Sequence, residues 1–200
     1  MYTFTSPGPR SALSHSKTGA IDVSLTESEF RSLRQTITLR GTARMALLPF
    51  TMLGWSLVAV LLLLFGDLPA AVIFPLAILV GGYEAIHALH VGAERVGRYL
   101  QVYYEDAADA PRWETTAMAV GPALPGGGID PLFSVVFISA TLANLIPAFT
   151  PEPTRLELAI LLPLHLAFVV RIVRARGAAA RQRAVELESY RAIRTQTPTR

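Results

Sequence analysis

The chain has 200 residues, of which 52% are hydrophobic and only 16% are charged, and its formal net charge is +3. Soluble domains usually carry about a quarter of charged residues, so this composition argues against an ordinary soluble domain. The chain has no cysteine, which excludes disulfides, thiolate metal sites, iron–sulfur clusters and cysteine nucleophiles. Arginine supplies nearly all the positive charge, a usage typical of GC-rich genomes, which suggests a bacterial protein.

The first segment of the chain is polar. Residues 1–23 are rich in Ser, Thr, Gly and Pro and predict a disordered leader. Thr26 and Glu29 then form a capping box, which predicts that a helix begins there. Its apolar and charged residues fall on opposite faces, which indicates an amphipathic helix on the membrane surface. Phe30, Leu33 and Ile37 form the apolar face, and Arg31, Arg34 and Gln35 the polar one.

Four apolar stretches predict transmembrane helices. The first, about residues 45–66, carries no charge between Met45 and Gly66 and can cross a hydrocarbon core about 30 Å thick. The second covers about 69–91 and continues as a helix to about 109, and the third covers 131–150. The fourth, about 156–173, spans only if Glu157 lies in the outer headgroups and Arg171 reaches the inner side. The Pro- and Gly-rich residues 115–130 predict a loop, with a short re-entrant segment as the alternative.

These stretches predict an all-α membrane protein, a bundle of about four transmembrane helices with cytoplasmic amphipathic helical extensions. In terms of domains, the leader (1–23) precedes the bundle (24–175), and a basic cytoplasmic tail (176–200) follows it. The three segments expected inside hold four, three and five arginines near the membrane, whereas the two outer turns hold only Arg155. Because arginine collects on the cytoplasmic side, we expect both termini in the cytoplasm and the bundle in a bacterial inner membrane.

The second helix and its extension carry a continuous polar stripe. An ionised side chain that faces lipid costs about 2.5–3.5 kcal/mol, so Glu84 should face the bundle or water, and Glu84 and His87 are functional candidates. Further along, Glu94, Arg95 and Arg98 are interpreted as a solvated cytoplasmic stripe, since exposed ion pairs are common on helices. Glu105, with Asp106 and Asp109, is interpreted as a solvated helix end.

His165 lies in the middle of the fourth helix, two residues after Pro163. Counted from the helix ends, it lies at a depth similar to that of Glu84. This depth allows an intramembrane polar cluster, which is then made up of Glu84, His87, His165 and Asn144. The alternative is a lone histidine that donates a hydrogen bond to the carbonyl of Ala159, which Pro163 leaves without its usual donor.

Two cofactor hypotheses use these histidines. His87 or His90, together with His165, has the ligand type of a b-type haem. Glu84-x-x-His87 is half of a di-iron carboxylate pattern, but the chain has no second copy of it. The sequence therefore fixes no cofactor and no metal site.

Small residues recur four apart along the second helix, a spacing that lets helix backbones approach closely. The pairs are Gly81 and Ala85, Ala88 and Gly92, and Ala93 and Gly97. They predict close packing within the bundle or between subunits.

The sequence contains no nucleophile–base set, so the favoured interpretation is a non-enzymatic accessory, assembly or oligomeric transport subunit. The alternative is a haem- or metal-dependent membrane redox protein. The expected partners are the lipid bilayer, with anionic headgroups on the basic residues 171–183, and a homo-oligomer or larger membrane complex. Nucleic acid is not an expected partner.

Overall fold

The computed structural model describes residues 15–105, 112–120, 131–149 and 152–196. These residues form five α-helices and two 3₁₀ turns, and the part of the chain they cover contains no strand. The order is α1 (His15–Phe65), η1 (Pro69–Val72), α2 (Ile73–Tyr103), α3 (Trp113–Val120), α4 (Pro131–Ala143), η3 (Ile146–Phe149) and α5 (Arg155–Gln196).

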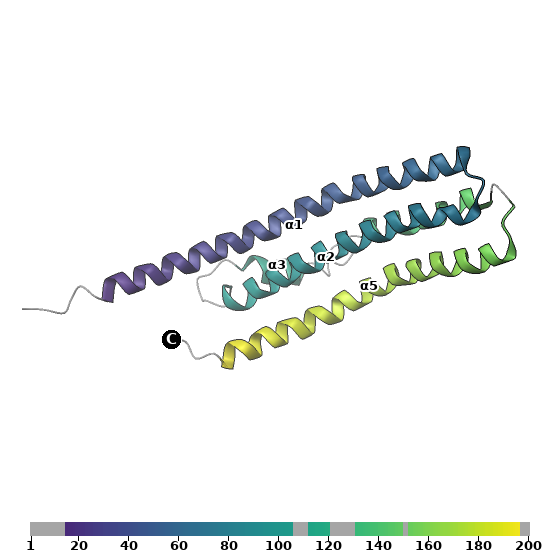
Figure 1. The fold of residues 1–200 in the computed structure, drawn as a ribbon. Helices are drawn as coiled ribbons and strands as arrows, with labels where there is room; N and C mark the ends of the chain where they lie inside the picture. Colours follow the sequence, from purple (N-terminus) through teal and green to yellow (C-terminus); the bar gives the residue numbers. More distant parts are fainter. Residues whose placement is uncertain (1–14, 106–111, 121–130, 150–151, 197–200) are drawn as a thin grey trace, which may run out of the picture.

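The long helices run side by side as a bundle (Figure 1). The start of α1 and the end of α5 lie at the same end of this bundle, and the two turns that contain η1 and η3 lie together at the other end (Figure 1). By length and composition, four segments are apolar enough to cross a membrane: Glu27–Phe65, Pro69–Tyr103, Leu132–Phe149 and Arg155–Gln196. The prediction of an all-helical bundle with four candidate transmembrane helices is confirmed.

Helix α1 is longer than predicted. It begins at His15, within the predicted leader, and passes the capping box at Thr26 and Glu29 without a break. Residues 1–14 lie outside the described part of the chain. The segment predicted as a separate surface helix packs along α2, where the ring of Phe30 lies 5.4 Å from that of Tyr104. A neighbouring helix partly covers the apolar face of this segment, and the segment is continuous with α1 and does not form a separate helix.

Two other segments also differ from the prediction. Residues 115–120, predicted as part of a loop, belong to helix α3, while residues 121–130 lie outside the described chain. The third predicted helix, 131–150, ends at Ala143, and the chain turns at Asn144 into η3. Pro147 lies inside η3 and has no N–H group with which to continue an α-helix.

Helices α2 and α5 lie where helices were predicted, but their ends differ from the predicted ends. η1 starts at Pro69, as predicted, and α2 ends at Tyr103; residues 106–109 of the predicted extension are not described. The fourth predicted helix and the basic tail form one helix, α5, with Pro163 inside it. The boundary predicted near 173–176 is therefore no break in the helix.

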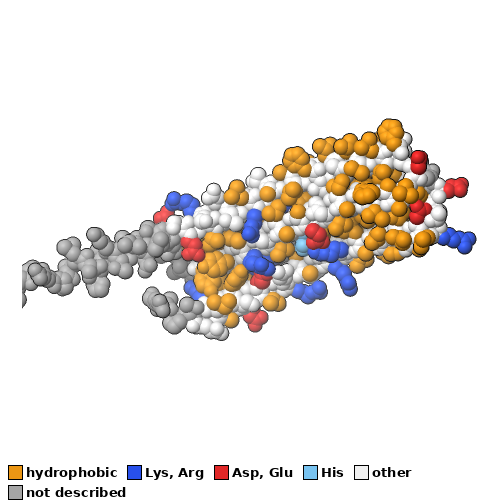
Figure 2. Space-filling model, viewed as in Figure 1, with side chains coloured by type: hydrophobic (Ala, Val, Ile, Leu, Met, Phe, Trp, Pro, Cys, Tyr) orange, Lys and Arg blue, Asp and Glu red, His pale blue; other side chains and the backbone are white. Residues whose placement is uncertain are grey.

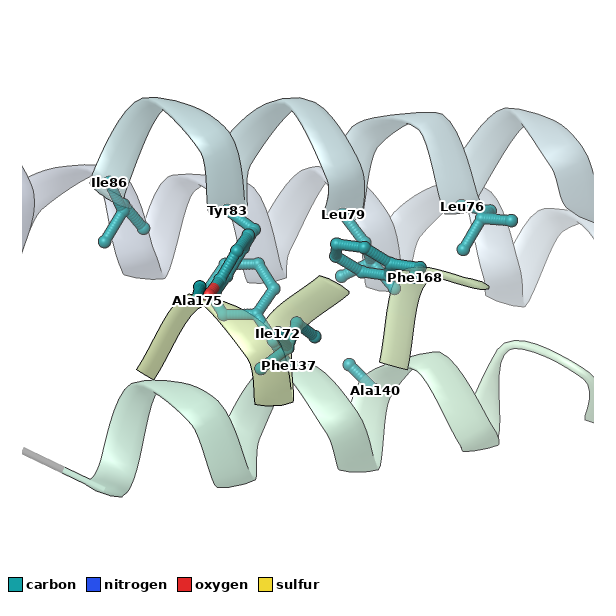
Figure 3. Packing of buried hydrophobic residues seen from close by; sticks show 9 residues of the cluster. All are labelled: Leu76, Leu79, Tyr83, Ile86, Phe137, Ala140, Phe168, Ile172 and Ala175. Carbon is teal, nitrogen blue, oxygen red and sulfur yellow. The ribbon is translucent and has the colours of Figure 1, made fainter. Parts of the chain in front are cut away.

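The core of the bundle lies between α2, α4 and α5 (Figure 3). Its buried side chains recur three or four residues apart, which places them on one face of each helix. They are Leu76, Leu79, Tyr83 and Ile86 of α2, Phe137 and Ala140 of α4, and Phe168, Ile172 and Ala175 of α5. The ring of Tyr83 meets Phe137 and Phe168 edge-on, with centroids 5.4 and 5.7 Å away.

Helix α1 contacts this core along a narrow strip. In the most apolar 18-residue stretch of α1 only 6% of the residues are buried, compared with 33% in the corresponding stretch of the segment that contains α2. At the closest approach Thr51 of α1 fills the space where Gly82 lacks a side chain. Apolar side chains cover much of the half of the molecule nearer the turns. On the same face, charged side chains gather near the middle of the whole molecule (Figure 2).

Candidate functional site

Asn144 and His165 form a buried polar pair inside the apolar half of the bundle. The two side chains are 0% and 2% exposed. The amide nitrogen of Asn144 lies 3.0 Å from Nε2 of His165 and donates to the carbonyl oxygen of Val72, also at 3.0 Å. The amide oxygen of Asn144 accepts a hydrogen bond from the indole N–H of Trp55 at 3.0 Å. Asn144 therefore ties α1, η1 and α5 to the end of α4.

The second ring nitrogen of His165, Nδ1, lies 2.8 Å from the carbonyl oxygen of Leu161. A histidine with its proton on Nδ1 donates to Leu161 and accepts from Asn144 at Nε2, so one neutral tautomer satisfies both contacts. The sequence-based alternative of a lone histidine bonded to the carbonyl of Ala159 is therefore wrong, since His165 contacts both Asn144 and the carbonyl of Leu161. The backbone acceptor is Leu161 and not Ala159, because the side chain of His165 reaches the carbonyl four residues before its own position.

Glu84 and His87 do not join this pair. Glu84 forms an ion pair with Arg171 at 2.8 Å, and both side chains are partly exposed, at 42% and 44%. The ring of His87 stacks on Tyr83 with centroids 5.9 Å apart. The predicted cluster of four residues is therefore divided into two separate sites.

The register between α2 and α5 explains this division. Three side-chain contacts join residues 87, 89 and 88 positions apart: Arg171 with Glu84, Arg183 with Glu94, and Arg98 with Glu186. This register places His165 opposite about residue 77 of α2, roughly 10 Å along the helix from Glu84. Depth counted from helix ends ignored this offset, so the prediction that the two groups meet is wrong.

Glu94, Arg95 and Arg98 face α5. Arg98 is only 4% exposed, and its guanidinium contacts Glu186 at 2.7 Å and Glu94 at 3.1 Å. Arg95 adds a second contact to Glu186 at 3.2 Å. The interpretation of these residues as a solvated face is wrong for Glu94 and Arg98, because α5 extends far enough to cover them.

The same interface contains two contacts from α5 and one from α1. Arg183 reaches Glu94 at 2.9 Å, and Gln182 donates to Glu186 at 2.7 Å. Nη1 of Arg44 lies 2.9 Å from Nδ1 of His90, whose Nε2 lies 3.5 Å from Glu94. Both ring nitrogens of His90 thus face groups of the chain itself, and α1, α2 and α5 are connected through Glu94.

Glu105 is buried at 4% exposure, and the interpretation as a solvated helix end is wrong for it. Its carboxylate accepts hydrogen bonds from the backbone N–H groups of Glu114 at 2.6 Å and Thr115 at 2.8 Å. These N–H groups belong to the first turn of α3, where they have no partner within the helix and attract negative charge. Glu105 therefore caps α3 and fixes this helix on α2.

Arg34 of α1 completes this contact. It pairs with Glu114 at 2.9 Å and lies 4.0 Å from Glu105. Burial raises the pKa of Glu114 above the ordinary value of a glutamate, while Arg34 acts in the opposite direction. The charge of Arg34 thus offsets part of the cost of bringing two carboxylates together.

Two of the small residues in the predicted pattern, Gly92 and Gly97, lie where another side chain comes close to α2. A side chain at Gly92 would collide with the guanidinium of Arg40, and one at Gly97 would lie 3.0 Å from the carboxylate of Glu114. Gly81 has nothing within 4 Å of the corresponding point, and its neighbour Gly82 makes the close contact with Thr51. The close helix packing is confirmed within the chain.

Several residues of these contacts were not identified from the sequence. On α5 they are Gln182, Arg183 and Glu186. The signal lies in the seven-residue spacing of the buried positions Leu161, His165, Phe168, Ile172 and Ala175, which reaches Gln182 and Glu186 when it is continued. Trp55, Arg44 and Glu114 have no comparable signal, because their partners lie 89, 46 and 80 residues away.

Among the described residues, no group of three or more His, Asp or Glu side chains is placed to hold a metal ion. His90 and His165 already use both ring nitrogens within the chain. Comparison with protein-family models, curated protein sequences and solved structures finds no match to the chain.

Proposed function

We propose that this chain is a non-enzymatic accessory or assembly subunit of a membrane complex, placed in a bacterial inner membrane with both termini in the cytoplasm. The four apolar helices would anchor it, and the charged half of the bundle would extend from the inner surface. We name this half the stalk: residues 27–43 of α1, 88–103 of α2, α3, and 172–196 of α5.

The observation that supports the proposal most strongly is that the buried polar side chains bind other groups of the chain itself. Asn144 and His165 bind each other and the backbone, and Arg98 and Glu186 bind each other across two helices. A general base or a nucleophile needs an atom that can reach a substrate, and these atoms are occupied by the chain itself. Connecting helices is the role that fits this geometry.

The length of the stalk supports a role in assembly. At 1.5 Å per residue its three long helices extend about 24–38 Å past the level of Arg44 and Arg171. Contacts between them, including Arg98 with Glu186 and Tyr99 with Glu29, hold the stalk together. An ordered extension of this length suits the presentation of a fixed surface to another subunit, and its basic residues suit a position beside anionic headgroups.

A haem- or metal-dependent redox function is the alternative. Ligation through His165 would break its hydrogen bond to Asn144 or to Leu161 inside an apolar environment, where unpaired polar groups are costly. His87 has a stacking contact but no facing histidine at its level in the bundle, since His165 lies closer to the turns. This arrangement makes the redox alternative the weaker proposal.

Two measurements on the full chain test the proposal. The first is an absorption spectrum with metal analysis of the purified protein, in which we expect no Soret band and no stoichiometric metal. The second is photocrosslinking in intact cells from the exposed stalk positions Gln35 and Glu188, with the buried position Leu100 as the control. Discrete adducts from the two exposed positions alone support a subunit role, whereas stoichiometric haem or a chain without adducts contradicts it.

A further inference from the structure

On one face of α5, two arginines have no partner among the described residues. Arg174 and Arg181 are exposed, and neither forms an ion pair or a side-chain hydrogen bond in the described part of the chain. Their neighbours on the same helix, Arg171 and Arg183, are paired with Glu84 and Glu94. Two of the α5 guanidiniums are therefore available to an anion from outside the chain.

The helix surface between these two arginines is nearly bare. Arg174 and Arg181 are seven residues apart, so they share a face and are separated by about 10 Å along the axis. Gly177 and Ala178 occupy this face between them, and nothing lies within 4 Å of the point where a side chain at Gly177 would begin. Two long arginine side chains can bend toward this gap from both ends.

The gap also lies at the right height for a phosphate group. Counted from Arg155 at the outer end of α5, Arg174 is about 28 Å along the helix, close to the thickness of a hydrocarbon core of about 30 Å. Arg181 lies about 10 Å further, on the stalk side. The inner headgroup layer therefore meets α5 between the two arginines.

We propose that Arg174 and Arg181 form a discrete binding site for an anionic phospholipid of the inner leaflet, whose phosphate sits over Gly177 and Ala178. Arginine guanidiniums bind phosphate oxygens through paired N–H groups, and the charges are complementary. The inference rests on the proposed orientation of the chain in the membrane. It adds a specific site to the general attraction between basic residues and headgroups.

The test uses the full chain purified in a neutral detergent and native mass spectrometry with phosphatidylglycerol or phosphatidylcholine as the added lipid. We expect the wild-type chain to retain phosphatidylglycerol in preference to phosphatidylcholine. The double variant R174Q/R181Q should lose about fivefold in affinity for each arginine, roughly 25-fold in all. The variant R191Q removes an exposed arginine further along α5 that has no ion pair among the described residues, and it should stay within about twofold of wild type.

Other outcomes are informative as well. Equal retention of phosphatidylglycerol by the double variant and by R191Q overturns the site, because the attraction is then diffuse charge. Displacement of the bound lipid by millimolar inorganic phosphate also overturns it, since the site would then select phosphate alone. Circular dichroism of each variant checks that the helices are retained. Absence of a preference for phosphatidylglycerol in the wild-type chain, when that chain still inserts and still gives stalk adducts, refutes this inference and leaves the proposed function standing.

Discussion

At the scale of single residues, the polar side chains of the bundle act as connectors between helices. Asn144 illustrates this best, since its amide contacts Trp55 of α1, Val72 of η1 and His165 of α5. Both N–H groups of the amide have a partner within the chain, and its oxygen accepts one hydrogen bond. The sequence identified Asn144 and His165 as candidate partners, but it also grouped them with Glu84, which binds Arg171 instead.

Replacing Asn144 should therefore loosen the bundle. For Asn144→Leu we expect a loss of about 1–2 kcal/mol in the free energy of unfolding, because Trp55, Val72 and His165 lose their shared partner where no water replaces it. The measurement is unfolding in mixed micelles of increasing sodium dodecyl sulfate fraction, followed by circular dichroism. Leu142→Ala on the same helix is the control, because Leu142 is exposed, and a comparable loss in that variant would refute a connector role.

At the scale of helices, α1 and α2 meet where one of them lacks a side chain. Thr51 occupies the space beside Gly82, whereas the adjacent Gly81 faces open space. The sequence predicted small-residue packing along α2 but started the pattern at Gly81. Which of two neighbouring glycines makes the contact depends on the rotation of α2 about its axis, which the core residues Leu79 and Tyr83 determine.

Alanine at these two positions should have opposite effects. Both changes replace glycine by a better helix former, worth up to about 1 kcal/mol in a helix interior. We expect Gly81→Ala to preserve or raise the thermal unfolding midpoint, and Gly82→Ala to lower it because the new methyl group collides with Thr51. Differential scanning fluorimetry in detergent compares them, and equal midpoints would mean that α1 does not pack closely on α2.

The α2–α5 contact continues as an ion-pair interface where the apolar core ends. The carboxylate of Glu186 contacts the side chains of Arg95, Arg98 and Gln182, and the side chain of Arg98 is buried. Removing one partner of a buried pair leaves an uncompensated charge and is strongly destabilising.

Changing Glu186 should therefore affect the stalk more than the membrane half. For Glu186→Gln we expect faster amide exchange in α5 beyond Gly177, measured by hydrogen–deuterium exchange mass spectrometry. Glu188→Gln is the matched control, because Glu188 is exposed and lies two residues further along the same helix. Identical exchange in the two variants would show that the interface contributes little to the order of the stalk.

At the scale of the whole molecule, the bundle has two unlike halves. Apolar side chains dominate the half near the turns, and the ion pairs lie in the half that contains the start of α1 and the end of α5 (Figures 1 and 2). The first half has the composition of a region that could cross a membrane, and the ion pairs of the second half would be costly in hydrocarbon.

The proposed orientation gives a direct labelling prediction. The chain has no cysteine, so single cysteines introduced at Gln35, Asp67 and Glu152 are labelled without background. A membrane-impermeant maleimide should react with Asp67→Cys and Glu152→Cys in intact cells, and with Gln35→Cys only after the cells are permeabilised. The reverse pattern would invert the topology, and labelling of all three in intact cells would argue against membrane insertion.

The sequence by itself determined the all-helical class and the four candidate spans, but not helix α3 or the point where α1 begins. Apolar stretches of this length must be helical if they enter lipid, because only a helix satisfies its own backbone hydrogen bonds there. The tertiary structure decided the partners of the polar residues, including the pairs of Glu84 with Arg171 and Arg98 with Glu186. These pairs depend on the register of α5 against α2, which is set by packing between residues almost ninety positions apart. Local periodicity carries no information about that offset, and a shift of two turns would give each charge a different partner.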